Sequence, residues 1–129
     1  MLKVLIGDDD TDDVELFQEA LYEVSPETEV KVATNGLEVL DELKSSDPRI
    51  VFLDINMPRM NGWEFLEEYS LLNKELQSRA IIIMLTTSQN PDDIERAKTW
   101  SCISEYITKP LTKKMMSEIT DKYFKVLQD

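Results

Sequence analysis

Histidine is absent from this 129-residue chain, and cysteine occurs once, at position 102. Without an imidazole there can be no Ser-His-Asp or Cys-His nucleophile, no zinc site built on histidine and no phosphohistidine. A single cysteine cannot form an internal disulfide, so a reducing cytosol is the expected compartment. Any chemistry must therefore use carboxylates, hydroxyl groups and lysine.

Long apolar runs and glycine-rich phosphate loops are also missing. No segment approaches the roughly 20 consecutive apolar residues of a membrane span, and the apolar N-terminal run ends at Gly7, too early for a signal peptide. Neither G-x-G-x-x-G nor G-x-x-x-x-G-K-[ST] occurs, which argues against dinucleotide or nucleoside triphosphate binding. The net charge of −12 repels nucleic-acid backbones. We expect a soluble cytoplasmic domain that binds neither membranes nor nucleic acid.

Short apolar runs alternate with amphipathic stretches along the chain. The runs have strand length and many β-branched residues, and they cover residues 3–7, 29–33, 50–53, 80–85 and 105–107. Apolar residues at helical spacing follow each run and predict five helices, with stripes over residues 14–24, 37–43, 66–76, 94–97 and 115–126. This alternation predicts an α/β domain with an open parallel sheet covered by helices on both faces.

The segment around Asn35-Gly36 allows two interpretations. An Asn-Gly pair between apolar residues is typical of a hairpin turn. The good helix formers of residues 41–44 instead continue the apolar stripe of a helix. We favour the helix.

Polar residues follow four of the five predicted strands. Asp8 and Asp9 follow the first strand, Asp54 the third, Thr86 the fourth and Lys109 the fifth. Ligands of open parallel sheets bind beyond the carboxyl ends of the strands, so we expect these side chains to share one rim. The sequence therefore predicts a functional site there.

Carboxylates gathered at one rim need a cation. Two unit charges about 4 Å apart repel by about 4 kcal/mol at an effective dielectric constant near 20. Oxygen ligands without histidine or thiolate favour Mg²⁺, which binds one or two carboxylates together with waters and a phosphoryl oxygen. Lys109 supplies a second positive charge. Asp54 follows the central hydrophobic strand at residues 50–53 and is the natural nucleophile, because a carboxylate can attack phosphorus without a base.

Four ordered blocks of sequence surround these strand ends. They are Val4-Leu-Ile-Gly-Asp8-Asp9-Asp10, Phe52-Leu-Asp54-Ile-Asn56-Met-Pro58-Arg-Met-Asn61-Gly62, Met84-Leu-Thr86-Thr87-Ser88 and Tyr106-Ile-Thr-Lys109-Pro110-Leu. In this order and spacing the chain resembles the CheY-like receiver domain of bacterial two-component response regulators. The resemblance implies a flavodoxin-like, doubly wound (βα)5 fold whose five-stranded parallel sheet has the order 2-1-3-4-5. It further implies one receiver domain over residues 1–129, with no output domain.

The resemblance also implies a metal site. Asp54 corresponds to the phosphoacceptor of the family. Asp9 corresponds to a direct ligand of Mg²⁺, and Asp8 to a residue that acts through a water. Asn56, two residues after the phosphoacceptor, is expected to offer its backbone carbonyl to the metal.

The remaining motif residues correspond to groups that hold and sense the phosphoryl group. Thr86 and Lys109 are expected to contact its oxygens, and the Lys109–Pro110 peptide bond is expected to be cis. Tyr106 corresponds to the switch aromatic, which turns inward when Thr86 moves toward the phosphoryl group.

The function implied is that of a phosphorylation switch. A histidine kinase or phosphotransfer protein would phosphorylate Asp54, and the change would alter a surface that contacts a downstream target protein. Beyond its own phosphoryl transfer and dephosphorylation the chain would not be an enzyme, and we expect a monomer or a weak dimer. The alternative is an interaction module of the same fold that works without phosphate, which has no need for so costly a cluster of charges.

The acidic run at positions 8–13 also suggests two rival sites and one structural role. A calcium loop is excluded because it needs glycine where Asp13 stands. A phosphatase with the Asp8-x-Asp10 pattern would need threonine at position 12, and the chain is too short for its usual additional elements. Asp12, Asp13 and Glu15 are therefore interpreted as negative charges that stabilise the N-terminus of a helix.

Overall fold

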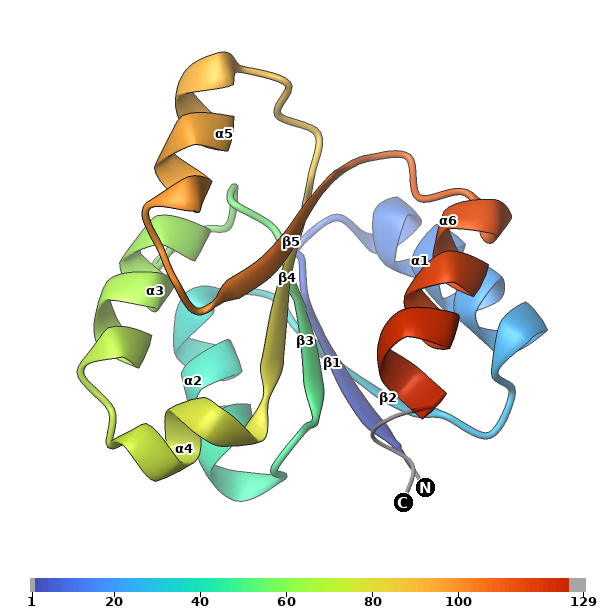
Figure 1. Cartoon of the computed structure of the whole chain (residues 1–129), viewed down its shortest axis with the longest axis horizontal. Coiled ribbons are helices and arrows are strands. Elements are labelled where there is room, and N and C mark those ends of the chain that lie inside the picture. Colours follow the sequence, from blue (N-terminus) through green and yellow to red (C-terminus); the bar gives the residue numbers. More distant parts are fainter. Residues whose placement is uncertain (1, 126–129) are drawn as a thin grey trace.

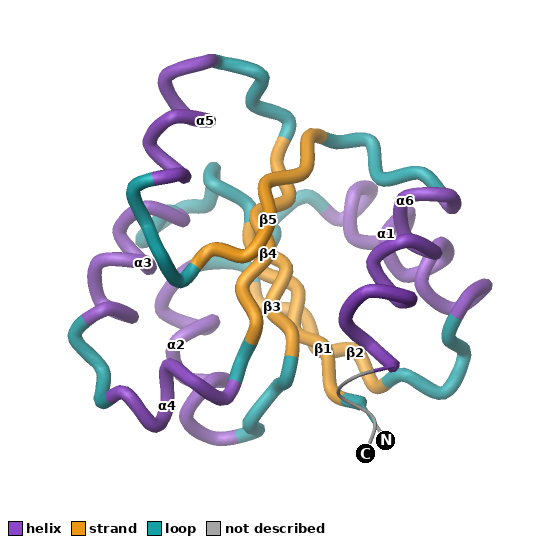
Figure 2. The backbone as a smooth tube through the Cα atoms, in the orientation of Figure 1, coloured by secondary structure: helices purple, strands orange, loops and turns teal. Residues whose placement is uncertain are grey.

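Five short parallel strands form the centre of the fold (Figures 1 and 2). The computed structural model describes residues 2–125. Its strands are β1 (Lys3–Gly7), β2 (Glu29–Ala33), β3 (Ile50–Leu53), β4 (Ile81–Thr86) and β5 (Ile103–Thr108). They lie side by side in the order β2-β1-β3-β4-β5, and every pair is parallel. The predicted α/β fold and its strand order are therefore confirmed.

Helices cover both faces of this sheet (Figure 1). They are α1 (Thr11–Val24), α2 (Gly36–Ser45), α3 (Gly62–Ser70), α4 (Lys74–Arg79), α5 (Pro91–Lys98) and α6 (Lys113–Ile119), followed by a π-helical turn, η1 (Thr120–Phe124). The helices α1 and α6 pack on one face, and α2, α3 and α5 lie on the other (Figure 1). Within residues 2–125, no helix has the length and apolar character needed to cross a membrane.

The inner strands are buried on both faces, which explains why their sequences do not alternate between apolar and polar residues. All four residues of β3 are inaccessible to solvent. Val51 and Leu53 belong to the core beneath α2 and α3, whereas Ile50 and Phe52 belong to the core beneath α1 and α6. Phe52 makes an edge contact with Phe17 of α1, with ring centroids 4.7 Å apart. These two cores hold the sheet in place.

The segment after Asn35 is a helix, so the hairpin interpretation is excluded. Asn35 has extended backbone angles, and its side chain accepts a hydrogen bond from the Glu38 backbone N–H. This is the geometry of a helix N-cap. The Glu38 carboxylate in turn accepts a hydrogen bond from the Thr34 backbone N–H at 2.7 Å. The Asn-Gly pair therefore starts α2.

The prediction of one helix across residues 66–76 is wrong. The chain turns at residues 71–73 and begins a separate helix, α4, so the described residues contain six α-helices where five were predicted. Asn73 caps the first turn of α4 with its side chain. The side-chain amide of Gln77 donates to the Ser70 carbonyl at 3.2 Å, which satisfies an acceptor that the end of α3 leaves free. It also donates to the Leu72 carbonyl in the turn, at 2.6 Å.

Two strand boundaries differ from the prediction by a few residues. The last strand, predicted over 105–107, runs over Ile103–Thr108, and its pairing with β4 shifts register between Ile103 and Glu105. The strand predicted over 80–85 is Ile81–Thr86. The last residue of the predicted C-terminal stripe, Val126, lies outside the described residues.

Gly62 is required where α3 begins against the end of β3. A Cβ atom at position 62 would lie 2.6 Å from the Asp54 carbonyl oxygen, a backbone atom that cannot turn away. At Gly7, the nearest atom to an added Cβ is a side-chain methyl group of Val39, at 2.8 Å. We expect Gly62→Ala to lower the free energy of unfolding by about 1–3 kcal/mol, and Gly7→Ala to cost less. Urea denaturation followed by circular dichroism measures both. A smaller loss at Gly62 than at Gly7 would contradict this account.

Candidate functional site

The candidate site lies at the carboxyl ends of β1, β3, β4 and β5. Backbone hydrogen bonds of the sheet continue one residue past the strands. The Asp54 N–H donates to the Gly7 carbonyl at 2.9 Å, and the Lys109 N–H donates to the Thr86 carbonyl at 2.7 Å. Asp8 directly follows β1. The sheet itself therefore fixes the backbone from which the Asp54 and Lys109 side chains extend.

Lys109 is the centre of the site. Its ammonium group donates to Asp8 Oδ2 at 2.6 Å, to Asp13 Oδ2 at 2.8 Å and to Asp54 Oδ2 at 3.1 Å. The Lys109 side chain is only 9% exposed. An ammonium group has three N–H donors, so each one has a carboxylate acceptor. The Lys109–Pro110 peptide bond is cis.

The carboxylates differ in their exposure to water. The side chain of Asp8 is 2% exposed, that of Asp54 is 9% exposed and that of Asp13 is 30% exposed. The second oxygen of Asp8 accepts the Asp10 backbone N–H at 3.0 Å, and that of Asp54 accepts the Asn56 backbone N–H at 3.2 Å. Both buried carboxylates are therefore held at each oxygen.

Burial and pairing act in opposite directions on the ionisation of these groups. Burial raises the pKa of Asp8, although hydrogen bonds from Lys109 and from the Asp10 backbone oppose that rise. Burial alone would lower the pKa of Lys109, but its hydrogen bonds to Asp13 and Asp8 and its attraction to Asp54 raise that pKa above the usual range of lysine. Lys109 is therefore positively charged at neutral pH.

The rim offers carboxylate and carbonyl oxygens, which are ligands that fit Mg²⁺. Within residues 2–125, no three acidic or cysteine side chains converge closely enough to chelate an ion by themselves. Asp8 and Asp54 both pair with the Lys109 ammonium group, while Asp9 and Asn56 are exposed. Mg²⁺ is typically held by one or two carboxylates with water and phosphate oxygens, which matches a rim of this kind.

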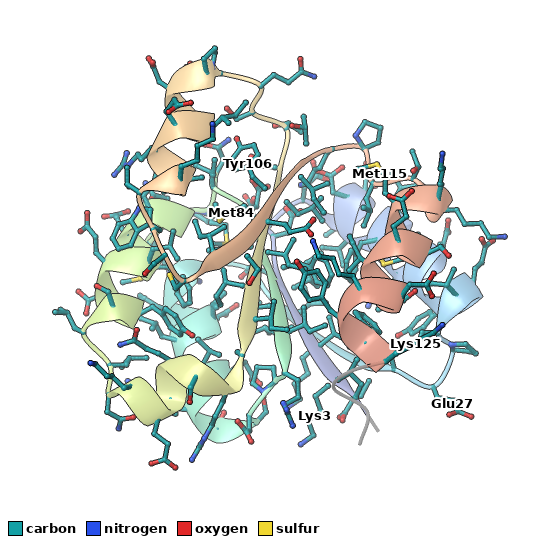
Figure 3. The ribbon with its side chains drawn as sticks, in the orientation of Figure 1. Lys3, Glu27, Met84, Tyr106, Met115 and Lys125 are labelled. Carbon is teal, nitrogen blue, oxygen red and sulfur yellow. The ribbon has the colours of Figure 1, made fainter. Side chains whose placement is uncertain are left out.

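Thr86 and Tyr106 both contact the loop between β4 and α5. The Thr86 side chain is fully buried, and its hydroxyl oxygen accepts the Ser88 backbone N–H at 3.3 Å. The Tyr106 hydroxyl donates to the Ser88 carbonyl at 3.0 Å. The Ser88 hydroxyl donates to Asp93 of α5 at 2.5 Å. Tyr106 packs against the core on the α5 side of the sheet, whereas Met115 lies on the α6 side (Figure 3).

A groove of about 500 Å³ opens beside Lys109, between α1 and the segment that follows β5. Its lining is mostly apolar and includes Leu16, Phe17 and Leu111. Leu16 is 59% exposed and forms part of the open side of this groove. The rim can therefore be approached from the α1 side.

Sequence reasoning missed two residues of this site. Asp13 was interpreted only as a charge at a helix N-terminus, yet its carboxylate also binds Lys109. Ser88 was assigned no role, yet it connects Thr86, Tyr106 and Asp93. Asp13 lies in the first turn of a helix that begins at the rim, and this position could have indicated that its side chain reaches the site.

Comparisons with known proteins agree with this geometry. Residues 4–121 match the family model of the response regulator receiver domain. A sensor histidine kinase, CheAY of Helicobacter pylori, is 34% identical over 101 residues, which are 75% of this chain and 12% of that protein. This chain spans less than half of the length of the curated relatives that it matches.

Solved structures of response regulators share the fold. The phosphorylated cyanobacterial phytochrome response regulator RcpA superposes with a TM-score of 0.84 at 27% identity, over 98% of this chain and 96% of that one. The Mn²⁺-bound form of response regulator Rcp1 superposes with a TM-score of 0.81 at 26% identity, over 99% and 98% of the two chains.

Removal of the Asp8 charge is expected to stabilise the metal-free protein. Because burial raises the pKa of Asp8, the contribution of Asp8 to stability falls as the pH rises from its unfolded-state pKa, about 4, through the higher folded-state pKa. Asp8→Asn lacks this fall. Its free energy of unfolding should therefore exceed that of the wild type near neutral pH, and the difference should shrink below the unfolded-state pKa.

Urea denaturation in EDTA over a pH series measures the effect of Asp8→Asn. Asp41→Asn removes an exposed carboxylate from α2 and serves as the control, for which we expect little change at any pH. An Asp8→Asn protein that is less stable than the wild type at neutral pH would contradict this assignment.

Proposed function

Because the chain belongs to the response regulator receiver domain family, we propose that it accepts a phosphoryl group on Asp54 in a Mg²⁺-dependent reaction. The donor is a histidine kinase or a phosphotransfer protein. The observation that carries this proposal is the placement of Asp54 at the end of the buried strand β3, within hydrogen-bond distance of the buried Lys109. The phosphorylated relative RcpA supports it.

The reaction uses the carboxylate of Asp54 as the nucleophile. One carboxylate oxygen attacks phosphorus, the bond from phosphorus to the donor breaks, and the leaving group keeps the electron pair. Charge is spread over the phosphoryl oxygens during transfer. Lys109 then donates an N–H to one of these oxygens, and the hydroxyl of Thr86 donates to another. No base is needed, since an ionised carboxylate has no proton to lose.

Asp8, Asp9, Asp54 and the backbone carbonyl of Asn56 are the groups that would hold Mg²⁺. The bound ion supplies positive charge to the oxygens of the transferring phosphoryl group. The donor set on the rim supports this proposal because all four residues offer oxygen ligands. The Mn²⁺-bound relative Rcp1 adds support for a divalent ion.

The switch consists of Thr86, Ser88 and Tyr106. Movement of the Thr86 hydroxyl toward a phosphoryl oxygen removes the acceptor of the Ser88 N–H and pulls on the β4–α5 loop. Tyr106 moves with the loop, because its hydroxyl donates a hydrogen bond to the Ser88 carbonyl. Phosphorylation thereby shifts the population of a surface formed by this loop, α5 and β5, which a downstream target protein contacts.

The apolar groove beside Lys109 is the surface against which part of the phosphoryl donor would pack. The match to a sensor kinase supports a kinase as the donor. Beyond its own phosphorylation and dephosphorylation the chain has no enzymatic activity in this proposal, and it acts in the cytoplasm as a monomer or a weak dimer. The alternative is a module of the same fold that binds its target without phosphate. The buried charges of Asp8, Asp54 and Lys109 count against that alternative, because burying charge is costly.

Phosphate uptake from acetyl phosphate and Mg²⁺, read by intact-protein mass spectrometry, tests the proposed function. We expect the wild type to gain the mass of one phosphoryl group, and Asp54→Asn and the EDTA-treated wild type to gain none. Asp41→Asn, which removes an exposed carboxylate from α2, is the matched control and should behave as the wild type. A wild type that stays unmodified would favour the alternative module. An Asp54→Asn protein that is modified equally would show that a residue other than Asp54 accepts the phosphoryl group.

The Thr86 hydroxyl is expected to couple phosphorylation to the β4–α5 loop. Amide hydrogen exchange should show that phosphorylation changes the protection of residues 87–90 in the wild type. Thr86→Val keeps the side-chain shape but lacks the hydroxyl, so that change should be reduced severalfold, whereas Thr86→Ser should retain most of it. Equal changes in all three proteins would rule out this coupling.

A further inference from the structure

Asp13 reaches Lys109 from a part of the fold that belongs to no strand end. It lies in the first turn of α1, and its carboxylate accepts a hydrogen bond from the Lys109 ammonium group at 2.8 Å, shorter than the 3.1 Å contact of Asp54. The backbone N–H of Asp13 donates to the side chain of Asp10, the N-cap of α1. The cap therefore fixes the helical turn from which the Asp13 side chain extends.

The three carboxylates around Lys109 have different roles in the proposed reaction. Asp54 becomes an acyl phosphate, so its carboxylate no longer pairs with the lysine in the same way. Asp8 belongs to the side of the rim that would hold Mg²⁺. Asp13 neither accepts the phosphoryl group nor holds Mg²⁺ in this proposal. Its side chain is 30% exposed and is the least buried of the three. It is therefore the one anionic partner of Lys109 that the reaction leaves unchanged.

Lys109 needs such a partner because of the nature of its side chain. Lysine carries a compact charge on a flexible four-carbon chain, and its donors rotate freely. Lys109 also lines the groove of about 500 Å³, so there is space into which its side chain could turn away from Asp54. A fixed carboxylate on α1 restricts this motion and keeps one N–H directed toward Asp54.

We propose that Asp13 is a positioning residue, which holds the ammonium group of Lys109 in the orientation needed to contact a phosphoryl group on Asp54. This inference rests on the proposed function of Asp54 and Lys109. It gives α1 a part in the reaction and assigns a second role to a carboxylate that the sequence pattern explains by helix stability alone.

The first test is the rate of Asp54 phosphorylation by acetyl phosphate and Mg²⁺, followed by intact mass. We expect Asp13→Asn to be about tenfold slower than the wild type, because small errors in the position of a catalytic group are costly. Asp12→Asn is the matched control, since it removes the same charge from the same helical turn at an exposed position. It should remain within about twofold of the wild type, because exposed charges contribute little.

A double-mutant cycle separates positioning from general effects on stability. In a Lys109→Met background, Asp13→Asn should change the phosphorylation rate little, because the group that it positions is gone. A second cycle measures urea midpoints of the metal-free protein and does not depend on phosphoryl transfer. We expect Asp13→Asn and Lys109→Met to be non-additive in that cycle, and Asp12→Asn and Lys109→Met to be additive.

The outcomes distinguish this inference from the proposed function. A wild type that takes up no phosphate overturns the proposed function and, with it, the role of Asp13. A wild type that is phosphorylated, with Asp13→Asn and Asp12→Asn at equal rates, overturns the role of Asp13 alone. Faster phosphorylation of Asp13→Asn, or additive effects of Asp13→Asn and Lys109→Met on the urea midpoint, also contradicts positioning.

Discussion

One buried ammonium group holds the functional end of this fold together. Lys109 follows β5, and its hydrogen bonds reach Asp8 after β1, Asp54 after β3 and Asp13 in α1. Without this cation, Asp8 and Asp54 would share a region of low water content with like charges only. The Lys109 ammonium group lowers the free-energy cost of burying these carboxylates. The proposed reaction needs the same group beside the phosphoryl group.

The architecture explains how residues so far apart in sequence meet. The order β2-β1-β3-β4-β5 places β3 in the centre, with β1 and β4 on either side. The two cores bury the strands on both faces, so the positions of their carboxyl ends are fixed by packing. Backbone hydrogen bonds one residue beyond the strands then fix the positions of Asp54 and Lys109. A site built on the ends of rigid strands is positioned more precisely than a site built on loops alone.

Most of the fold could be predicted from the sequence, because buried strands and amphipathic helices leave strong local patterns. The break at residues 71–73 was missed because apolar residues at helical spacing continue across it, while the hydrogen bonds of Gln77 that close the turn are not visible in such a pattern. Asp13 was missed for a different reason. An acidic residue in the first helical turn already has a sufficient local explanation, and only the three-dimensional arrangement brings it to Lys109.

We propose that the carboxylate held by Lys109 at the end of β3 is the group that receives phosphate. Reduction of the phosphorylated protein with borohydride converts an acyl phosphate into a stable alcohol, and peptide mapping by tandem mass spectrometry then locates that residue. We expect a single reduced residue, Asp54. Reduction at another carboxylate of the rim, such as Asp8 or Asp13, or at none, would contradict it.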